Sequence, residues 1–106
     1  MKEQEKTFRG FRIKDQCFVT LNDEPFDPIP FNGLPQKFDW GNDSLEARQL
    51  AYAILCNIYD IDIASRFYLD FAEEIIADWY IDKWTFPECI IREQMKRIYK
   101  QKAKAA

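Results

Sequence analysis

The sequence contains no histidine, and it has only three glycines in 106 residues. Histidine is the most frequent general base in enzymes and a common zinc ligand, so both roles lack their usual residue. No GxGxxG or P-loop pattern occurs, which excludes the glycine-rich loops that cradle phosphate groups. These absences argue against an enzyme, and they predict neither a cofactor nor a metal site.

Cysteine is also scarce, because the chain has only Cys17, Cys56 and Cys89, widely spaced and without a CxxC pair. An odd number at such spacings does not predict a disulfide framework, and buried thiols in a reducing cytoplasm are expected instead. No apolar run approaches the ~18 residues of a membrane span. Residues 1–10 lack the apolar core of a signal peptide, so we expect a cytoplasmic protein.

Aromatic residues, by contrast, are abundant at 16%, and the net charge is −3 with a pI of about 5.0. The length predicts a single domain over residues 1–106, with frayed ends at 1–6 and 101–106. An acidic domain has little overall attraction for nucleic acid. So many rings indicate either an aromatic core or rings left exposed for a partner.

The N-terminal part predicts a β-hairpin over Thr7–Leu21, with the turn at residues 14–16 and apolar residues alternating on both sides. A bulge at Gly10 would bring Phe8 and Phe11 to one face. Residues 22–37 carry four prolines and predict an extended connection, with a possible third strand near Phe31 or Phe38.

Three helices are expected after this connection. The first has the most regular apolar pattern and starts at an N-cap Asp43 with Glu46 three residues later. The second runs from about Ile63 to Ile81 behind a cap at Asp62. A turn at residues 82–84 and a cap at Thr85 precede the third. The chain is therefore predicted to be an α+β domain, with an N-terminal hairpin packed on a three-helix unit.

Two charged faces stand out on these helices. The second helix carries its carboxylates at helical spacing, which is typical of a solvated face and lacks a second element for a metal site. The third helix and its tail are basic and offer an alternative, contacts to a nucleic-acid backbone. The nucleic-acid contacts would be Arg92, Lys96, Arg97 and Lys100.

The segment FDWG (Phe38–Gly41), followed by QLAYAIL (Gln49–Leu55), resembles a family of small uncharacterised domains from bacteria and their phages. In that family the FDWG motif leads through a glycine-rich segment into a helix close to QLALAIL. The resemblance extends to FRG (Phe8–Gly10) and Trp84, but this chain has NDSLEAR at residues 42–48 where relatives have glycines. It implies no known activity, and it implies a phage or mobile-element origin, in which small acidic proteins often block a host component.

Together these observations predict a non-enzymatic protein-interaction domain, and the implied phage or mobile-element origin predicts inhibition of a host component. Its surface would combine the aromatic motif with the acidic helix, since aromatic residues are enriched in binding hot spots. A structural homodimer built on leftover apolar helix faces is a further alternative. The predicted partner-binding residues are Phe38, Trp40, Asn42, Asp43, Asp70, Glu73, Glu74 and Asp78.

Overall fold

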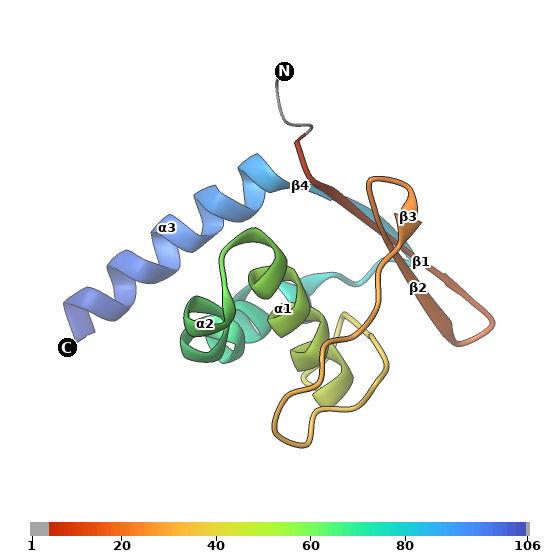
Figure 1. Cartoon of the computed structure of the whole chain (residues 1–106), viewed down its shortest axis with the longest axis horizontal. Coiled ribbons are helices and arrows are strands. Elements are labelled where there is room, and N and C mark those ends of the chain that lie inside the picture. Colours follow the sequence, from red (N-terminus) through yellow and green to blue (C-terminus); the bar gives the residue numbers. More distant parts are fainter. Residues whose placement is uncertain (1–4, 106) are drawn as a thin grey trace.

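A computed structural model, which describes residues 5–105, contains a four-stranded antiparallel sheet and three α-helices (Figure 1). The sheet has the order β3-β2-β1-β4, and the α+β fold with an N-terminal hairpin is confirmed. The elements in chain order are β1 (Thr7–Ile13), β2 (Gln16–Leu21), β3 (Glu24–Pro25), α1 (Leu45–Ile58), α2 (Ile61–Glu74), the 3-10 turn η1 (Ile76–Asp78), β4 (Lys83–Pro87) and α3 (Glu88–Ala105).

The first three strands are joined by two-residue turns. Lys14 and Asp15 have φ of 48° and 68°, and Asn22 and Asp23 have φ of 50° and 68°. Tight hairpins favour this left-handed backbone because it matches the twist of the strands, and Asn and Asp tolerate it. The resulting register runs without interruption from Phe8 opposite Leu21 to Ile13 opposite Gln16.

The predicted bulge at Gly10 is therefore wrong. Since the strand is regular, Phe8 and Phe11 point to opposite faces of the sheet, and Phe8 is fully buried while Phe11 is half-buried. Gly10 has another reason to be glycine. It lies opposite Trp84 in the sheet, and a Cβ at residue 10 would come within 2.2 Å of the Trp84 ring.

Strand β4 is the longest element that the sequence did not predict. Residues 82–84 were expected to form a turn and Thr85 to cap a helix, but β4 pairs antiparallel with β1 along its whole length. Its partner strand, β1, lies more than seventy residues earlier in the chain, so no local sequence pattern predicts the pairing. The additional strands of the sheet are β3 and β4, and neither includes Phe31 or Phe38.

The helices begin and end at residues other than those expected. Ser44 caps α1 and accepts a hydrogen bond from the Ala47 amide at 3.1 Å, in place of Asp43. Asp60 caps α2 in the same way, in place of Asp62. Helix α2 ends at Glu74 and a 3-10 turn follows, so the continuous helix predicted up to Ile81 is wrong.

Within the described residues, hydrogen bonds and helical structure extend into both segments for which fraying was predicted. The Lys6 carbonyl accepts a hydrogen bond from the Glu88 amide at 2.7 Å, and its ammonium group donates to the Asn57 carbonyl. Helix α3 continues to Ala105, into the predicted frayed tail. The other residues for which fraying was predicted, 1–4 and 106, lie outside the described part of the chain.

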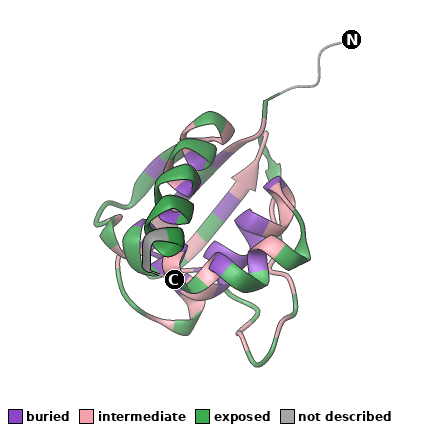
Figure 2. Cartoon of the chain, turned by 90° about the vertical axis from the view of Figure 1, so that its left-hand side faces the viewer, coloured by how far each residue is buried: buried purple, intermediate pink, exposed green. Residues whose placement is uncertain are grey.

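The core lies between the inner face of the sheet and helices α1 and α2. Helix α1 is buried on most of its surface, whereas α3 buries only one side, through Ile91, Met95 and Ile98 (Figure 2). Three alanines in α1 have almost no exposed surface and allow close approach of its neighbours. In the described residues, no helix is both long and apolar enough to cross a membrane.

Among the residues whose burial is described, Gln49 is the one polar side chain in this core, and it has no exposed surface. Its amide nitrogen donates to the carbonyl groups of Ile29 at 2.8 Å and Pro35 at 3.1 Å. Its amide oxygen accepts from the Ile29 N–H at 3.2 Å. Gln49 thus attaches the proline-rich connection to α1.

We expect Gln49→Met to lower the free energy of unfolding by about 2–3 kcal/mol, because three backbone groups lose their buried partner. The measurement is urea denaturation at pH 7. The matched control is Gln36→Met at an exposed position, with an expected change within about 0.5 kcal/mol. Equal effects of the two substitutions would contradict the proposed attachment.

Candidate functional site

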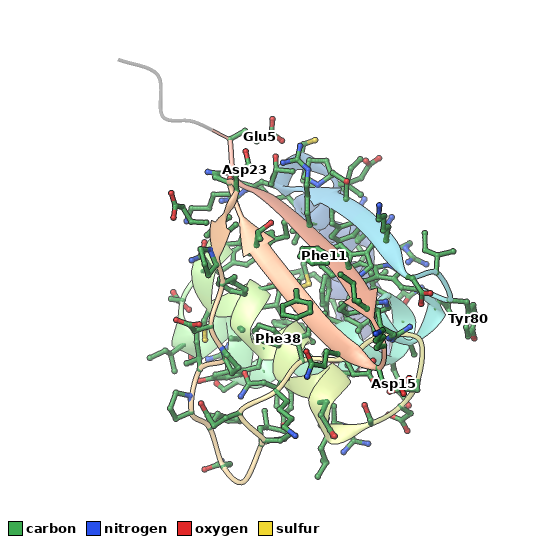
Figure 3. The ribbon with its side chains drawn as sticks, turned by 90° about the vertical axis from the view of Figure 1, so that its right-hand side faces the viewer. Glu5, Phe11, Asp15, Asp23, Phe38 and Tyr80 are labelled. Atoms are coloured by element: carbon green, nitrogen blue, oxygen red, sulfur yellow. The ribbon has the colours of Figure 1, made fainter. Side chains whose placement is uncertain are left out.

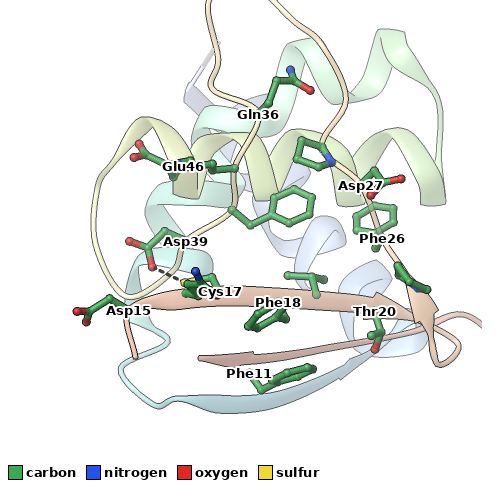
Figure 4. A pocket seen from close by; sticks show the side chains of 16 residues that line it. Phe11, Asp15, Cys17, Phe18, Thr20, Phe26, Asp27, Gln36, Asp39 and Glu46 are labelled. Atoms are coloured by element: carbon green, nitrogen blue, oxygen red, sulfur yellow. Dashed lines mark hydrogen bonds between the residues drawn. The ribbon is translucent and has the colours of Figure 1, made fainter. Parts of the chain in front are cut away.

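A groove of about 720 Å³ runs beside β2, on the side away from β1 (Figure 4). We call it the β2 groove. Its lining consists of residues 15–20 along β2 and the preceding turn, residues 25–28 after β3, and residues 36–39 ahead of α1, together with Phe11 and Glu46. It exists because β3 is only two residues long, so the chain leaves the edge of β2 after Pro25.

The groove combines apolar rings with carboxylates. Phe26 and Phe38 stack with ring centroids 5.7 Å apart and line the groove with Val19. Asp15, Asp27 and Glu46 also line it and form no ion pair within the described residues. Among the described residues, Lys37 is the one lysine that lines the groove, so negative charge prevails there.

The outer side of β2 adds further aromatic surface. Phe11 and Phe18 lie opposite each other on β1 and β2 and stack with centroids 5.2 Å apart. The helices pack on the other face of the sheet, and Phe11 points away from them (Figure 3). Phe18 is 41% exposed, so its ring forms an accessible apolar border of the groove.

One end of the groove is closed by a polar cluster around Asp39, the acidic residue of the FDWG motif. Arg12 donates to one Asp39 oxygen at 2.6 Å, and the Cys17 thiol lies 3.4 Å from the same oxygen. The Trp40 amide donates to that oxygen at 2.8 Å, and Asn42 donates to the other oxygen at 3.0 Å. Asp39 therefore joins the motif loop to both strands of the hairpin.

These contacts decide the ionisation of the cluster. Burial alone would raise the pKa of Asp39, but hydrogen bonds from Asn42, Arg12 and the Trp40 amide outweigh it and lower the pKa below the usual 3.8. Burial raises the pKa of the Cys17 thiol, and its hydrogen bond with Arg12 only partly opposes that rise. Cys17 is thus a protonated thiol at neutral pH, and a protonated thiol is a poor nucleophile.

A pH-dependent contribution to stability follows from Asp39. Because its pKa is lowered by folding, the stabilisation is fully present above the ordinary value of 3.8 and is lost as the pH falls through the lowered value. We expect the difference in unfolding free energy between the wild type and Asp39→Asn to be largest near pH 7 and to shrink below pH 3.8. Denaturant titrations across this range measure it. A difference that is independent of pH would contradict the assignment.

The structure corrects the aromatic half of the predicted partner-binding surface. Trp40 is 1% exposed and donates from its indole N–H to the Ile81 carbonyl at 2.9 Å. Phe38 is also buried and exposes only a small part of its ring to the β2 groove. These rings hold the motif on the core. Gly41 adds to this attachment, because its amide donates to the Ile76 carbonyl and the backbone lies so close that a Cβ at Gly41 would clash with the Trp79 carbonyl oxygen.

The acidic half of the predicted surface is accessible but divided. Asn42 and Asp43 are exposed, although Asn42 binds Asp39 and Asp43 pairs with Arg48. Asp70 pairs with Lys102 at 3.0 Å. The remaining acidic residues, Glu73, Glu74 and Asp78, are exposed.

The break in α2 also separates these carboxylates. Asp78 belongs to η1, so the spacing predicted for one continuous helix face does not hold. Among the described residues, no three His, Cys, Asp or Glu side chains gather as potential metal ligands.

The basic residues of α3 fall into two groups. Arg92 pairs with Glu88 at 2.7 Å and lies over the Tyr59 ring, and Lys102 pairs with Asp70. Their charges are therefore engaged within the molecule. By contrast Lys96, Arg97 and Lys100 are exposed and form no ion pair with the described residues.

Apart from Phe38, the residues of the β2 groove were not among those selected from the sequence. The alternation of Cys17, Val19 and Leu21 indicated one face of a strand, but nothing in it showed that the strand edge would remain open. Asp39 was within reach of sequence reasoning, because it is the one ionisable residue of FDWG. Its partner Arg12 lies in the hairpin, and only the fold brings the two together.

Comparison with known protein families identifies one family whose profile matches this chain. The profile of the family described as "Family of unknown function (DUF6166)" matches residues 8–97. The chain therefore belongs to this family. No curated protein and no solved structure matches the chain.

Proposed function

We propose that this member of a family of unknown function is a non-enzymatic domain that binds a protein partner in the β2 groove. The observation that carries the proposal is the combination, in one open groove, of an aromatic floor and carboxylates that form no ion pair with the described residues. Interfaces of this kind gain affinity from buried aromatic anchors and specificity from complementary charge. The partner surface would accordingly be apolar and basic.

The chemistry of the groove supports binding rather than catalysis. The Asp39 carboxylate is occupied by several donors, and its lowered pKa makes it a weak base. The neighbouring Cys17 thiol has a raised pKa, which disfavours the thiolate that covalent catalysis needs. Both groups therefore serve better to hold the groove in shape.

The cellular setting is part of the same proposal. We place the protein in the cytoplasm because Cys17, Cys56 and Cys89 are all free thiols, which suits a reducing compartment. The resemblance in the FDWG region supports a phage or mobile-element origin. In that setting the bound partner would be a host component that the domain inhibits.

A pull-down from host-cell lysate tests the proposal, with and without nuclease treatment. The tagged wild type is compared with Asp27→Lys/Glu46→Lys, which reverses two carboxylates that line the groove. The matched control is Glu73→Lys/Glu74→Lys, which changes the net charge equally at exposed positions on α2. Thermal unfolding verifies that both variants fold.

We expect a stoichiometric protein band that survives nuclease, is lost from the groove variant and is retained by the α2 variant. Loss from the α2 variant alone would move the binding surface to the acidic helix. Retention by both variants would refute an acidic binding surface altogether.

Nucleic-acid binding through α3 is a second candidate. It is favoured by Lys96, Arg97 and Lys100, which are exposed on a helix that extends away from the sheet (Figure 1). If this candidate is correct, affinity for single-stranded or duplex DNA falls steeply with added salt, and Lys96→Glu/Lys100→Glu abolishes it. No binding at low salt would end this candidate.

A structural homodimer is a third candidate. An apolar hollow of about 280 Å³ lies between α2 and α3, and Phe67, Met95 and Tyr99 contribute to its lining. Tyr99 is 61% exposed beside it, so a second copy would bury a large apolar side chain. Light scattering over a concentration series checks this candidate, and Tyr99→Asp is expected to yield a monomer.

A further inference from the structure

The edge of β2 has backbone groups that point into the β2 groove. In an antiparallel pair, hydrogen-bonded and non-bonded residue pairs alternate. The two-residue turn makes Ile13 and Gln16 a bonded pair, so Cys17 and Val19 fall in non-bonded positions relative to β1. Their backbone N–H and C=O groups therefore point away from β1, toward the groove.

The hydrogen bonds around the hairpin agree with this alternation. The Val19 carbonyl accepts from the Phe26 amide at 3.0 Å, on the side of the groove. The Arg12 amide, opposite Cys17, donates away from β2 to the Asp82 carbonyl at 2.8 Å. Within the described residues no partner is found for the Cys17 N–H, the Cys17 carbonyl or the Val19 N–H.

The two edges of the sheet differ in how they are protected. Natural sheets block free edges with charged residues and proline. Strand β4 carries Lys83 and Pro87 and forms one edge of the sheet. Beyond the two residues covered by β3, β2 has neither lysine nor proline between Gln16 and Val19. Its open stretch is bordered by the groove instead.

We propose that the partner contributes an extended basic segment that adds to the free edge of β2 as a strand. This inference rests on the proposed binding function and specifies the partner's form. Main-chain bonds to the Cys17 N–H, the Cys17 carbonyl and the Val19 N–H supply the pairing, as in other complexes formed by strand addition. Apolar side chains on one side of the segment cover Phe38, and lysine or arginine residues meet Asp15, Asp27 and Glu46.

The open edge itself is measurable without a partner. Amide hydrogen exchange followed by NMR is expected to be fast at Cys17 and Val19 and slow at Phe18 and Thr20, whose amides bond to β1. Protection of the Cys17 amide that increases with protein concentration would show a second copy on this edge. Such a result would overturn the assignment to a foreign segment.

The binding test uses a synthetic seven-residue peptide of alternating lysine and valine as the probe. We expect it to perturb and protect the Cys17 and Val19 amides of the labelled full chain and to leave the Thr85 amide on the other edge unchanged. A peptide of alternating glutamate and valine, and the lysine peptide with N-methylated valines, are expected to bind at least tenfold more weakly. Absence of probe binding, or perturbation elsewhere, overturns the proposal.

Two variants separate strand addition from binding of another kind. Cys17→Pro removes the outward N–H without touching a bond to β1, and Cys17→Ala removes only the thiol. We expect Cys17→Pro to bind the probe at least tenfold more weakly than Cys17→Ala, which is the reference because both variants lack the thiol.

Thr85→Pro, on the other edge, is the control for effects of proline on the sheet, and NMR spectra verify the folding of each variant. If Cys17→Pro keeps its lysate partner while Asp27→Lys/Glu46→Lys loses it, the proposed function stands and strand addition is refuted.

Discussion

Replacing Trp40 by alanine is expected to lower the free energy of unfolding by about 4 kcal/mol, at the scale of other buried aromatic truncations. The ring is 1% exposed and packs edge-on against Trp84 at a centroid distance of 5.3 Å. The Arg12 guanidinium lies 4.8 Å from the ring centroid, and the indole N–H binds the Ile81 carbonyl. Alanine would leave a cavity and an unpaired carbonyl together.

Guanidinium denaturation of three variants separates these contributions. Trp40→Phe keeps most of the packing and loses the indole hydrogen bond, so we expect a smaller cost of about 1–2 kcal/mol. Tyr80→Ala removes an aromatic residue that is 78% exposed and is expected to change stability by less than about 0.5 kcal/mol. If Trp40→Ala resembled Tyr80→Ala, Trp40 would be a surface ring and the sequence-based prediction would be restored.

Gly10→Ala is expected to cost about 3 kcal/mol, the upper part of the range for overpacked cores. A Cβ at this residue would lie 2.2 Å from the Trp84 ring, closer than any real contact allows. That ring is confined by Trp40 on one side and by Trp79 at a centroid distance of 4.4 Å. A shift of the indole toward these rings would disturb the core, and without such a shift the added methyl group must distort the pairing of β1 with β4.

Gly33→Ala is the control for the loss of glycine. Gly33 has φ of 78° but no atom near an added Cβ, so only backbone strain of about 1–2 kcal/mol is expected. A double-mutant cycle with Trp84→Leu tests the cause, because a smaller residue at position 84 makes room for the methyl group. The prediction fails if the cost of Gly10→Ala is the same in both backgrounds.

The sequence was informative where neighbouring residues decide the structure. The apolar spacing of residues 47–58 predicted α1, and alternation around a short polar turn predicted the β1–β2 hairpin. Helix ends were less accurate. Ser44 and Asp43 are both good caps, and the choice between them depends on how Gly41 and Asn42 fix the preceding loop.

The candidate site was largely invisible in the sequence. The sequence does not distinguish a buried tryptophan from an exposed one. The burial of Trp40 depends on Trp84 and Arg12, which come from distant segments of the chain. The β2 groove depends on the short length of β3, which ends where the proline-rich connection is drawn to α1 by Gln49. The sequence-based prediction named Asn42 and Asp43, and Asn42 contacts the groove residue Asp39. It did not name Asp39 itself.

The sequence by itself determined the fold class, the hairpin and α1, because these follow from periodicity and turn chemistry within a few residues of each other. It also determined what the chain lacks: histidine, phosphate-binding glycine motifs and a cysteine framework. Only the tertiary structure decided that residues 83–87 form a strand, that Trp40 is buried, and that the outward edge of β2 at Cys17 and Val19 borders a groove. Each of these depends on the contact of segments far apart in the chain, whose free energy no local pattern encodes.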